Sequence, residues 1–275
     1  MSSPLIKYDS TIVLPPALCG NIGYYALMAS HRDVVIDRYC RYDKRRKLMH
    51  RYDIADVNGR LSLTIPTIKP HYGTSATWNE AGVSAHGGWW NIHKVALWSA
   101  YGRTPFFEYY IDELMPYLQP RDGIQPESLM DLNIGIDAII RRIAGIESNI
   151  RYELTSEEKE QLKKADIQTP PASQATSPKT GEDCSNETLQ QKQCSPLLGE
   201  LSLATEGYSN NQTTPSIKDH RNDDFNLATP VEYYQVRATQ HGFIPNLSIL
   251  DLIFNMGPET PLVLKKIIDL NHQSI

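Results

Sequence analysis

His241-Gly-Phe-Ile-Pro-Asn-Leu-Ser-Ile-Leu-Asp-Leu-Ile-Phe-Asn-Met-Gly-Pro-Glu259 is the part of the chain whose local chemistry is easiest to interpret. Pro245 cannot continue a preceding helix or strand, and Asn246 can cap a helix that begins after it. The apolar residues that follow give this helix a surface broad enough to bury: Leu247, Ile249, Leu250, Leu252, Ile253 and Phe254. The stretch therefore predicts a short helix docked on the rest of the protein.

The end of this helix is also marked in the sequence. Asn255 and Gly257 suit its C-terminal cap, and Pro258 just beyond them prevents it from resuming. Two interpretations remain open at this point. Either the helix only seals the core, or its polar residues also face a cleft and bind a ligand: Asn246, Ser248, Asp251 and Asn255.

The composition indicates one globular core with a long insertion. The chain has 275 residues, which exceeds one average domain without requiring two, and its hydrophobic content of 40% permits a core. The formal net charge of −5 argues against nucleic acid as the principal partner, because duplex binding needs a basic face.

The sequence shows no sign of export or of a membrane span. No apolar run approaches the roughly 18 residues that a transmembrane helix needs, and residues 1–7 lack the charged-then-apolar order of a signal peptide. We therefore expect a cytoplasmic protein. The cysteines have no CxxC spacing, so we expect reduced thiols at Cys19, Cys40, Cys184 and Cys194.

The commonest cofactor signatures are absent as well. The sequence contains no HExxH, no GxxxxGK[ST] and no GxGxxG motif. Its histidines also lack the spacing of a zinc site. The sequence thus identifies no cofactor and no metal.

The first third of the chain predicts an α/β fold with a parallel-biased sheet. Residues 10–14 read as a strand, residues 20–29 as a helix and residues 33–37 as a second strand, and such a β-α-β unit favours parallel pairing. Residues 61–65 alternate and follow the turn Asn58-Gly59, so we expect a third strand there.

The pattern then changes to a helical period. We expect helices at residues 89–101, 106–118, 129–143 and 155–165, and a short strand at residues 150–154. Between residues 168 and 228 the composition turns to Ser, Thr, Pro, Gln, Asn and Asp, which cannot bury enough apolar area to fold. The expected organisation is an α/β domain with a helical second half (1–167), a disordered insertion (168–228) and a C-terminal segment that packs back on the same domain (229–275).

Several blocks of the chain resemble the WbqC-like proteins, a bacterial family associated with surface polysaccharide and O-antigen loci. Besides residues 241–259, the blocks are Leu14-Pro-Pro16 with Ile22-Gly-Tyr-Tyr25 and Asp33-Val-Val-Ile-Asp37; His50-Arg51 with Gly59-Arg-Leu-Ser-Leu-Thr-Ile-Pro66; Trp90, His93, Tyr101 and Pro105-Phe-Phe-Glu-Tyr-Tyr110; and Asp131-Leu-Asn133 with Gly145-Ile146. The resemblance also implies a strand at Tyr233-Tyr-Gln-Val236.

One departure from the family pattern bears on the chemistry. Many members have His-Gln-Pro at the end of the first strand, where a histidine would position phosphates as in nucleotidylyltransferase-like folds. This chain has Leu14-Pro15-Pro16 instead. The chain therefore lacks, at this place, the histidine that such a route of nucleotidyl transfer would use.

The basic run Arg41-Tyr-Asp-Lys-Arg-Arg-Lys-Leu-Met-His-Arg51 is a candidate phosphate site. Guanidinium groups bind pairs of phosphate oxygens, and the run follows the second strand, where α/β sheets place ligands. We choose Arg45 and Arg51 as phosphate ligands. The alternative is a solvated charged face.

Two residues are candidates for proton transfer. Asp37 would stand at the carboxyl end of the second strand, and His93 lies in an aromatic helix whose Tyr101 could line a sugar site. A core histidine and core aromatics explain the same helix equally well. In the C-terminal motif, Asn246 and Ser248 are candidate substrate ligands.

The resemblance and these residues together imply a cytoplasmic enzyme of surface-glycan biosynthesis. It would bind a nucleotide-linked or sugar-phosphate precursor and transfer a group to or from it. The alternative is a noncatalytic binding or assembly protein of the same pathway. The sequence leaves open the donor, the acceptor, the transferred group and the oligomeric state.

Overall fold

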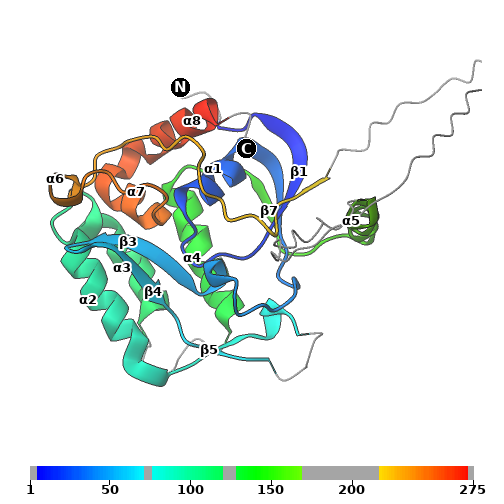
Figure 1. The fold of residues 1–275 in the computed structure, drawn as a ribbon, viewed down its shortest axis with the longest axis horizontal. Helices are drawn as coiled ribbons and strands as arrows, with labels where there is room; N and C mark the ends of the chain where they lie inside the picture. The colour runs from blue at the N-terminus through cyan, green and yellow to red at the C-terminus, as the bar shows by residue number, and fades with distance from the viewer. Residues whose placement is uncertain (1–4, 71–75, 120–127, 169–216, 272–275) are drawn as a thin grey trace, which may run out of the picture.

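The core of the protein is a parallel sheet with strand order β7-β2-β1-β8 (Figure 1). The computed structural model describes residues 5–70, 76–119, 128–168 and 217–271. The strands are β1 (Tyr8–Leu14), β2 (His31–Ile36), β7 (Asn149–Arg151) and β8 (Ile217–Asp219), and every neighbouring pair is parallel. The expected α/β fold with a parallel-biased sheet is confirmed.

The sheet is apolar on both faces, as parallel sheets usually are. Ile12 and Leu14 of β1 belong to the main core, which includes the fully buried helix α1 (Ile22–Ser30). Val13 and Val35 point to the other face, where they contact Leu154 and Leu162 of the α5 region. The alternation of strand side chains thus places α1 on one face and α5 (Ser156–Gln168) on the other.

The expected third strand does form, but it belongs to a different sheet. It is β4 (Gly59–Thr64), which pairs antiparallel with β3 (Arg51–Asp56). The tight turn before Gly59 (φ 103°) makes the adjacent strand the nearest partner, so a local hairpin forms instead of a parallel crossover. A smaller antiparallel pair joins β5 (Thr67–Ile68) to β6 (Gly82–Val83).

The expected helices are present as α2 (Trp89–Tyr101), α3 (Phe107–Leu118), α4 (Leu129–Ile143) and α5. Thr155 and Glu158 form the expected capping box at the start of α5. The Glu158 amide donates to Thr155 Oγ1 at 3.2 Å, and the Thr155 amide donates to Glu158 Oε2 at 2.8 Å.

The C-terminal motif folds into α7 (Ile249–Met256), the most central helix of the protein. It contacts α1, α2, α3, α4 and β3, and all its residues from Ile249 to Asn255 are buried. In Figure 1 it lies between the parallel sheet and the group formed by α2, α3 and the β3–β4 hairpin. The predicted docked helix is therefore the centre of the core.

The ends of α7 differ from the expectation in two respects. Ser248, not Asn246, is the N-cap, and its Oγ accepts from the Leu250 amide. Gly257 (φ 51°) ends the helix as expected, but Pro258 lies in a single 3₁₀ turn that leads into a further helix, α8 (Thr260–Leu270). Proline is tolerated in the first turn of a helix, so it did not stop the chain from becoming helical again.

The predicted disordered insertion is too long at its C-terminal end. Residues 169–216 lie outside the described residues, but residues 217–228 are ordered and include β8, which pairs with β1. Phe225 in this segment is buried against Tyr24. The strand implied at residues 233–236 is absent. These residues form a loop ahead of the short helix α6 (Ala238–His241).

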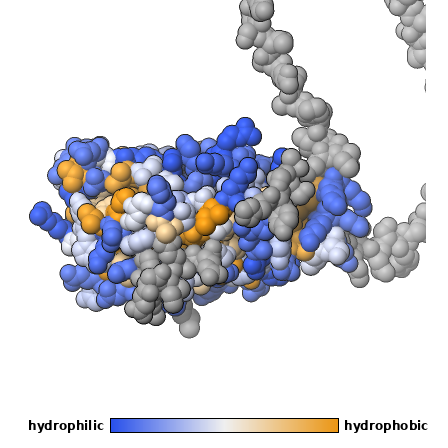
Figure 2. Space-filling model, turned by 90° about the horizontal axis from the view of Figure 1, so that it is seen from below, coloured by the Kyte–Doolittle hydropathy of each residue, from blue (hydrophilic) through white to orange (hydrophobic). Residues whose placement is uncertain are grey.

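The surface seen in Figure 2 is mainly hydrophilic, with small apolar patches separated by polar side chains. Exposed large apolar side chains are spread over several elements, among them Val57, Ile92, Tyr109 and Leu262. No helix within the described ranges combines the length and apolar character needed to cross a bilayer.

Candidate functional site

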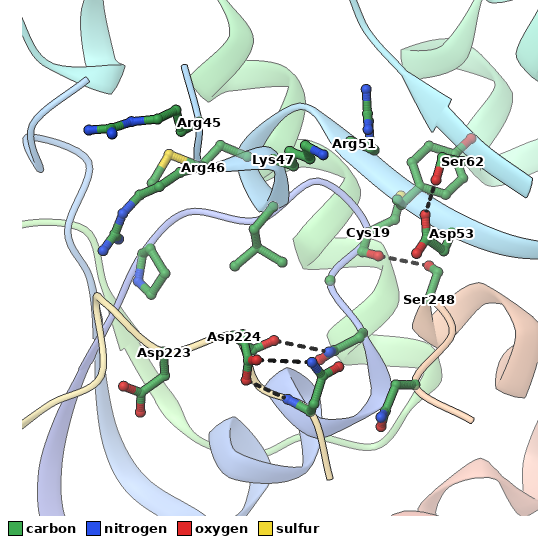
Figure 3. A pocket seen from close by; sticks show the side chains of 18 of the residues that line it. Cys19, Arg45, Arg46, Lys47, Arg51, Asp53, Ser62, Asp223, Asp224 and Ser248 are labelled. Carbon is green, nitrogen blue, oxygen red and sulfur yellow. Dashed lines mark hydrogen bonds between the residues drawn. The ribbon is translucent and has the colours of Figure 1, made fainter. Parts of the chain in front are cut away.

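A hollow of about 680 Å³ lies beyond the carboxyl ends of three parallel strands, β1, β2 and β8 (Figure 3). The loop after β1 contributes residues 19–21, the loop after β2 residues 45–49, and the loop after β8 residues 222–224. The β3–β4 hairpin and the segment before α7 complete the wall. This is the edge at which open α/β sheets bind their ligands, and the volume is typical of small-molecule sites.

Two distant parts of the chain are joined at the base of this hollow. Ser248 Oγ donates to the Cys19 carbonyl at 2.7 Å, and the Ile249 amide donates to the Gly20 carbonyl at 2.9 Å. In return, the Ile22 amide donates to the Leu247 carbonyl at 3.1 Å. The first helix and the central helix α7 therefore start side by side at the hollow.

The backbone around the hollow is strained. Among the described residues, those other than glycine with a positive φ are Cys19 (46°), Phe225 (57°) and Asn246 (56°). Cys19 and Asn246 line the hollow, and Phe225 stands between Asp224 and Asn226, which line it too. Such conformations are costly for residues with a Cβ and cluster at functional sites. Strained residues from three separate segments of the chain therefore lie together around the hollow.

One side of the hollow is strongly basic. Figure 3 shows Arg45, Arg46, Lys47 and Arg51 along this side. Arg51 Nε donates to Thr64 Oγ1 at 2.7 Å, and neither Arg51 nor Lys47 has an acidic partner in the described part of the chain. Their charge therefore remains available to an anionic ligand.

Acidic and amide side chains lie on the other side of the hollow, where Figure 3 labels Asp223 and Asp224. Asp224 accepts from the Asn226 amide at 3.2 Å and from Asn226 Nδ2 at 3.0 Å, and its carbonyl accepts from Asn21 Nδ2 at 3.4 Å. These bonds fix the loop after β8 against the start of α1. The loop thereby forms a defined wall.

Four of the residues chosen from the sequence meet at the hollow: Arg45, Arg51, Asn246 and Ser248. Arg45 is largely exposed, and its ion-pair partner in the described part of the chain is Asp43, at 3.3 Å. Asn246 Oδ1 accepts from the Leu227 amide at 3.0 Å, so this side chain also holds the chain that follows the acidic wall. Ser248 has two structural bonds, as the N-cap of α7 and as donor to Cys19.

Asp37 stands at the carboxyl end of β2, where the sequence placed it, but it does not line the hollow. Its Oδ2 accepts from Arg221 Nη1 at 2.9 Å, and Arg221 also pairs with Asp219 at 2.7 Å. Its bonds to the two carboxylates raise the pKa of Arg221, and Asp219 has the larger effect. Asp37 is therefore an anchor for the loop that follows β8.

His93 and Tyr101 lie in the core, away from the hollow. His93 Nδ1 is 3.2 Å from the Tyr52 hydroxyl and Nε2 is 3.3 Å from the Thr64 carbonyl. The Tyr101 hydroxyl accepts from the Ala55 amide at 3.2 Å and donates to Asp251 at 2.8 Å. The structure thus places both side chains in the packing between α2, α7 and the β3–β4 hairpin.

The burial of His93 has a consequence for stability. Desolvation lowers the pKa of His93 from 6.5 to about 4, against the opposing effect of its bond to Thr64. Between pH 6.5 and about pH 4, His93 is therefore protonated in the unfolded chain but not in the folded protein. The free energy of unfolding falls as the pH is lowered through this range. We expect wild type to lose about 2 kcal/mol more than His93→Gln between pH 7 and pH 5.

Urea unfolding of both proteins at the two pH values measures this difference. The comparison is needed because other buried groups also titrate. His31, for example, has its pKa lowered to about 4 by burial. Parallel losses in the two proteins would contradict the assignment to His93.

Sequence reasoning missed the residues that follow β8. His220 Nδ1 lies 2.8 Å from Asp223 Oδ2, and its Nε2 is buried without a partner among the described residues. Arg221 binds Asp37 and Asp219, and Asn222 lines the hollow. The only signal was the polar run His220-Arg-Asn-Asp-Asp224, which has the composition of the insertion before it.

The cysteines near the site are not activated thiols. Burial raises the pKa of Cys19 well above its usual value and that of Cys40 to about 12. Both are free and buried. Within the described residues, no group of His, Cys, Asp and Glu side chains is arranged to hold a metal ion.

Comparison with known proteins gives one match. The sequence profile described as the WbqC-like protein family matches residues 16–262, which includes every residue that lines the hollow except Pro15. No curated protein and no solved structure matches the chain.

Proposed function

Because the chain belongs to the WbqC-like protein family, we propose that it is a cytoplasmic enzyme of surface polysaccharide or O-antigen biosynthesis. In this proposal it binds a nucleotide-linked or phosphorylated precursor and transfers a group to or from it. The pathway rests on the association of the family with such loci. The ligand class rests on the hollow.

The observation that supports the ligand class is the unpaired positive charge at the strand ends. Arg51 and Lys47 line the hollow, and in the described residues they have no acidic partner, while Arg45 has Asp43 as its one ion-pair partner there. Exposed pairs of this kind contribute little and are easily exchanged for a ligand. Arg45 and Arg51 would hold phosphate oxygens, and Asn246 and Ser248 would border the bound molecule.

Proton transfer, assigned from the sequence to Asp37 and His93, has a third candidate in His220. Asp37 forms an ion pair with Arg221, and His93 is buried in the core. His220 is oriented by Asp223, and both residues line a separate hollow of about 250 Å³, which shares Asp223 with the larger one. A histidine whose Nδ1 is held by a carboxylate is a common arrangement for an acid or base.

A thermal-shift titration tests the proposed ligand class. A ligand present at one hundred times its Kd should stabilise the protein by about 2.7 kcal/mol. Suitable probes are glucose 6-phosphate, pyrophosphate, and nucleoside diphosphates with and without an attached sugar. We expect Arg51→Ala to weaken binding by about tenfold or more, because a charge-assisted bond is lost.

Arg32→Ala is the matched control, because Arg32 is an exposed arginine at the start of β2, away from the hollow, and pairs with Asp9. It should bind like wild type. If none of the phosphorylated probes stabilises wild type, or if Arg51→Ala binds them as well as wild type does, the proposed ligand class is wrong.

A noncatalytic binding or assembly protein is the second candidate function. It is favoured by the positions of Asp37 and His93, which do not line the hollow. Under this alternative the protein binds the same ligand and leaves it unchanged. Incubation with each stabilising ligand, with and without candidate acceptors, followed by mass spectrometry of the ligand, distinguishes the two candidates.

A further inference from the structure

A second hollow of about 400 Å³ lies beside the first. The loop after β2 lines it with Arg41, Tyr42 and one acidic residue, Asp43, and the loop after β8 lines it with Arg221. Arg41 has no acidic partner in the described residues, and its backbone pairs with Thr77, so its position does not depend on its side chain. This hollow is therefore basic like the first.

The two hollows meet at a shared wall. Arg45, Arg46 and Asn222 line both of them. Arg46 donates to the Arg221 carbonyl and to Asn222 Oδ1, so its guanidinium joins the loop after β2 to the loop after β8. A pair of arginines thus stands between two spaces, each large enough to hold part of a ligand.

The chemistry of the two spaces differs. Tyr42 in the smaller hollow packs against Trp78, with ring centroids 4.4 Å apart, and so supplies a rigidly held aromatic ring. The larger hollow offers hydrogen-bonding groups such as Asn21, Ser62 and Asn226. An aromatic ring suits a planar or ring-shaped group, and amides and hydroxyls suit a group rich in hydroxyls.

We propose that the site takes a diphosphate substituted at both ends, such as a nucleoside diphosphate sugar. The diphosphate lies across the shared wall at Arg45 and Arg46, with one organic group in each hollow. This inference rests on the proposed function and narrows it, because a free phosphate or a singly substituted one would occupy only one side.

Matched ligand pairs test the inference by isothermal titration calorimetry on the full chain. The pairs are UDP-glucose with UDP, ADP-glucose with ADP, and GDP-mannose with GDP. A free diphosphate carries more negative charge near neutral pH than its sugar ester, so simple attraction to the basic wall favours the free diphosphate. We expect the opposite order, with the sugar ester of at least one pair binding about tenfold more tightly.

Two variants assign the effect to the two hollows. Arg45→Ala removes a shared residue and should weaken both members of a pair. Arg41→Ala removes a residue of the smaller hollow alone and should weaken the sugar ester by about tenfold, with little change for the free diphosphate. Arg103→Ala, an exposed arginine at the turn after α2, is the control and should change neither.

Each outcome decides a different claim. Equal binding within every pair, or tighter binding of the free diphosphates, overturns the inference and leaves the proposed phosphate site intact. An unchanged preference in Arg41→Ala overturns the role of the second hollow. Binding of glucose 6-phosphate without binding of any diphosphate refutes the two-ended ligand alone. If no phosphorylated probe binds, the proposed ligand class and the inference both fail.

Discussion

Asp251→Ala is expected to lower the free energy of unfolding by about 3–5 kcal/mol. The carboxylate is buried in α7 and accepts from the Tyr101 hydroxyl at 2.8 Å, the Tyr233 hydroxyl at 2.5 Å and Gln235 Nε2 at 2.9 Å. Burial raises the pKa of Asp251, and these donors oppose the rise. Alanine would leave buried donors without an acceptor, and that cost is larger than the net value of the bonds themselves.

Urea unfolding of Asp251→Ala and two companions checks this result. Asp251→Asn keeps one acceptor oxygen and should lose less than the alanine variant. Asp112→Ala, at an exposed position of α3, should stay within about 0.5 kcal/mol of wild type. A loss below about 1 kcal/mol in Asp251→Ala would show that the network contributes little.

Gly23→Ala is expected to destabilise the protein by about 2–3 kcal/mol and to abolish ligand stabilisation. A Cβ at Gly23 would lie 2.1 Å from the Phe225 carbonyl oxygen, so helix and loop could not both stay in place. Phe225 lies between Asp224 and Asn226, which line the hollow. The substitution therefore displaces a wall of the site without altering any residue that lines it.

Gly135→Ala is the matched control for this prediction. Gly135 is also in a helix, and its added Cβ would be crowded by the ring of Tyr117, at 2.0 Å. That ring is partly exposed and can rotate, whereas the backbone at Phe225 cannot. Alanine also favours the helix by about 1 kcal/mol, so we expect little net change in stability and normal ligand binding. Normal ligand binding by Gly23→Ala would show that the contact between Gly23 and Phe225 is not needed to hold the wall of the hollow in place.

The sequence predicted those elements whose own residues carry a strong pattern. The opening β-α-β unit and helices α2 to α5 follow from apolar periodicity and from caps such as Thr155 with Glu158. Among the elements that the sequence did not predict, β8 and α8 lacked such signals. β8 has one apolar residue in three, Ile217, and α8 follows a turn that contains Pro258, a residue type that usually marks the end of a helix. Their formation depends on partners elsewhere, β1 for the strand and α1 for the helix.

The sequence predicted those residues of the hollow whose polar character and place next to a strand or helix both indicated a ligand site. Arg45 and Arg51 belong to a basic run after a strand, and Asn246 and Ser248 precede an apolar helix, so their types and places both indicated a wall. His93 and Tyr101 were ambiguous because helical spacing cannot tell a core-facing side from a cleft-facing one. Their side of α2 faces the core because the β3–β4 hairpin packs against it.

The pairing of β8 with β1 sets the order in which the molecule can be assembled. Asn21 and Asp224, which bond to each other in one wall of the hollow, are separated by 203 residues in sequence. Until the ribosome has released residues 217–219, one edge of β1 lacks its final neighbour, and an open strand edge invites association with other chains. Truncated products that end before this segment should therefore aggregate, and the hollow cannot take shape in a nascent chain until residues 217–224 have been synthesised.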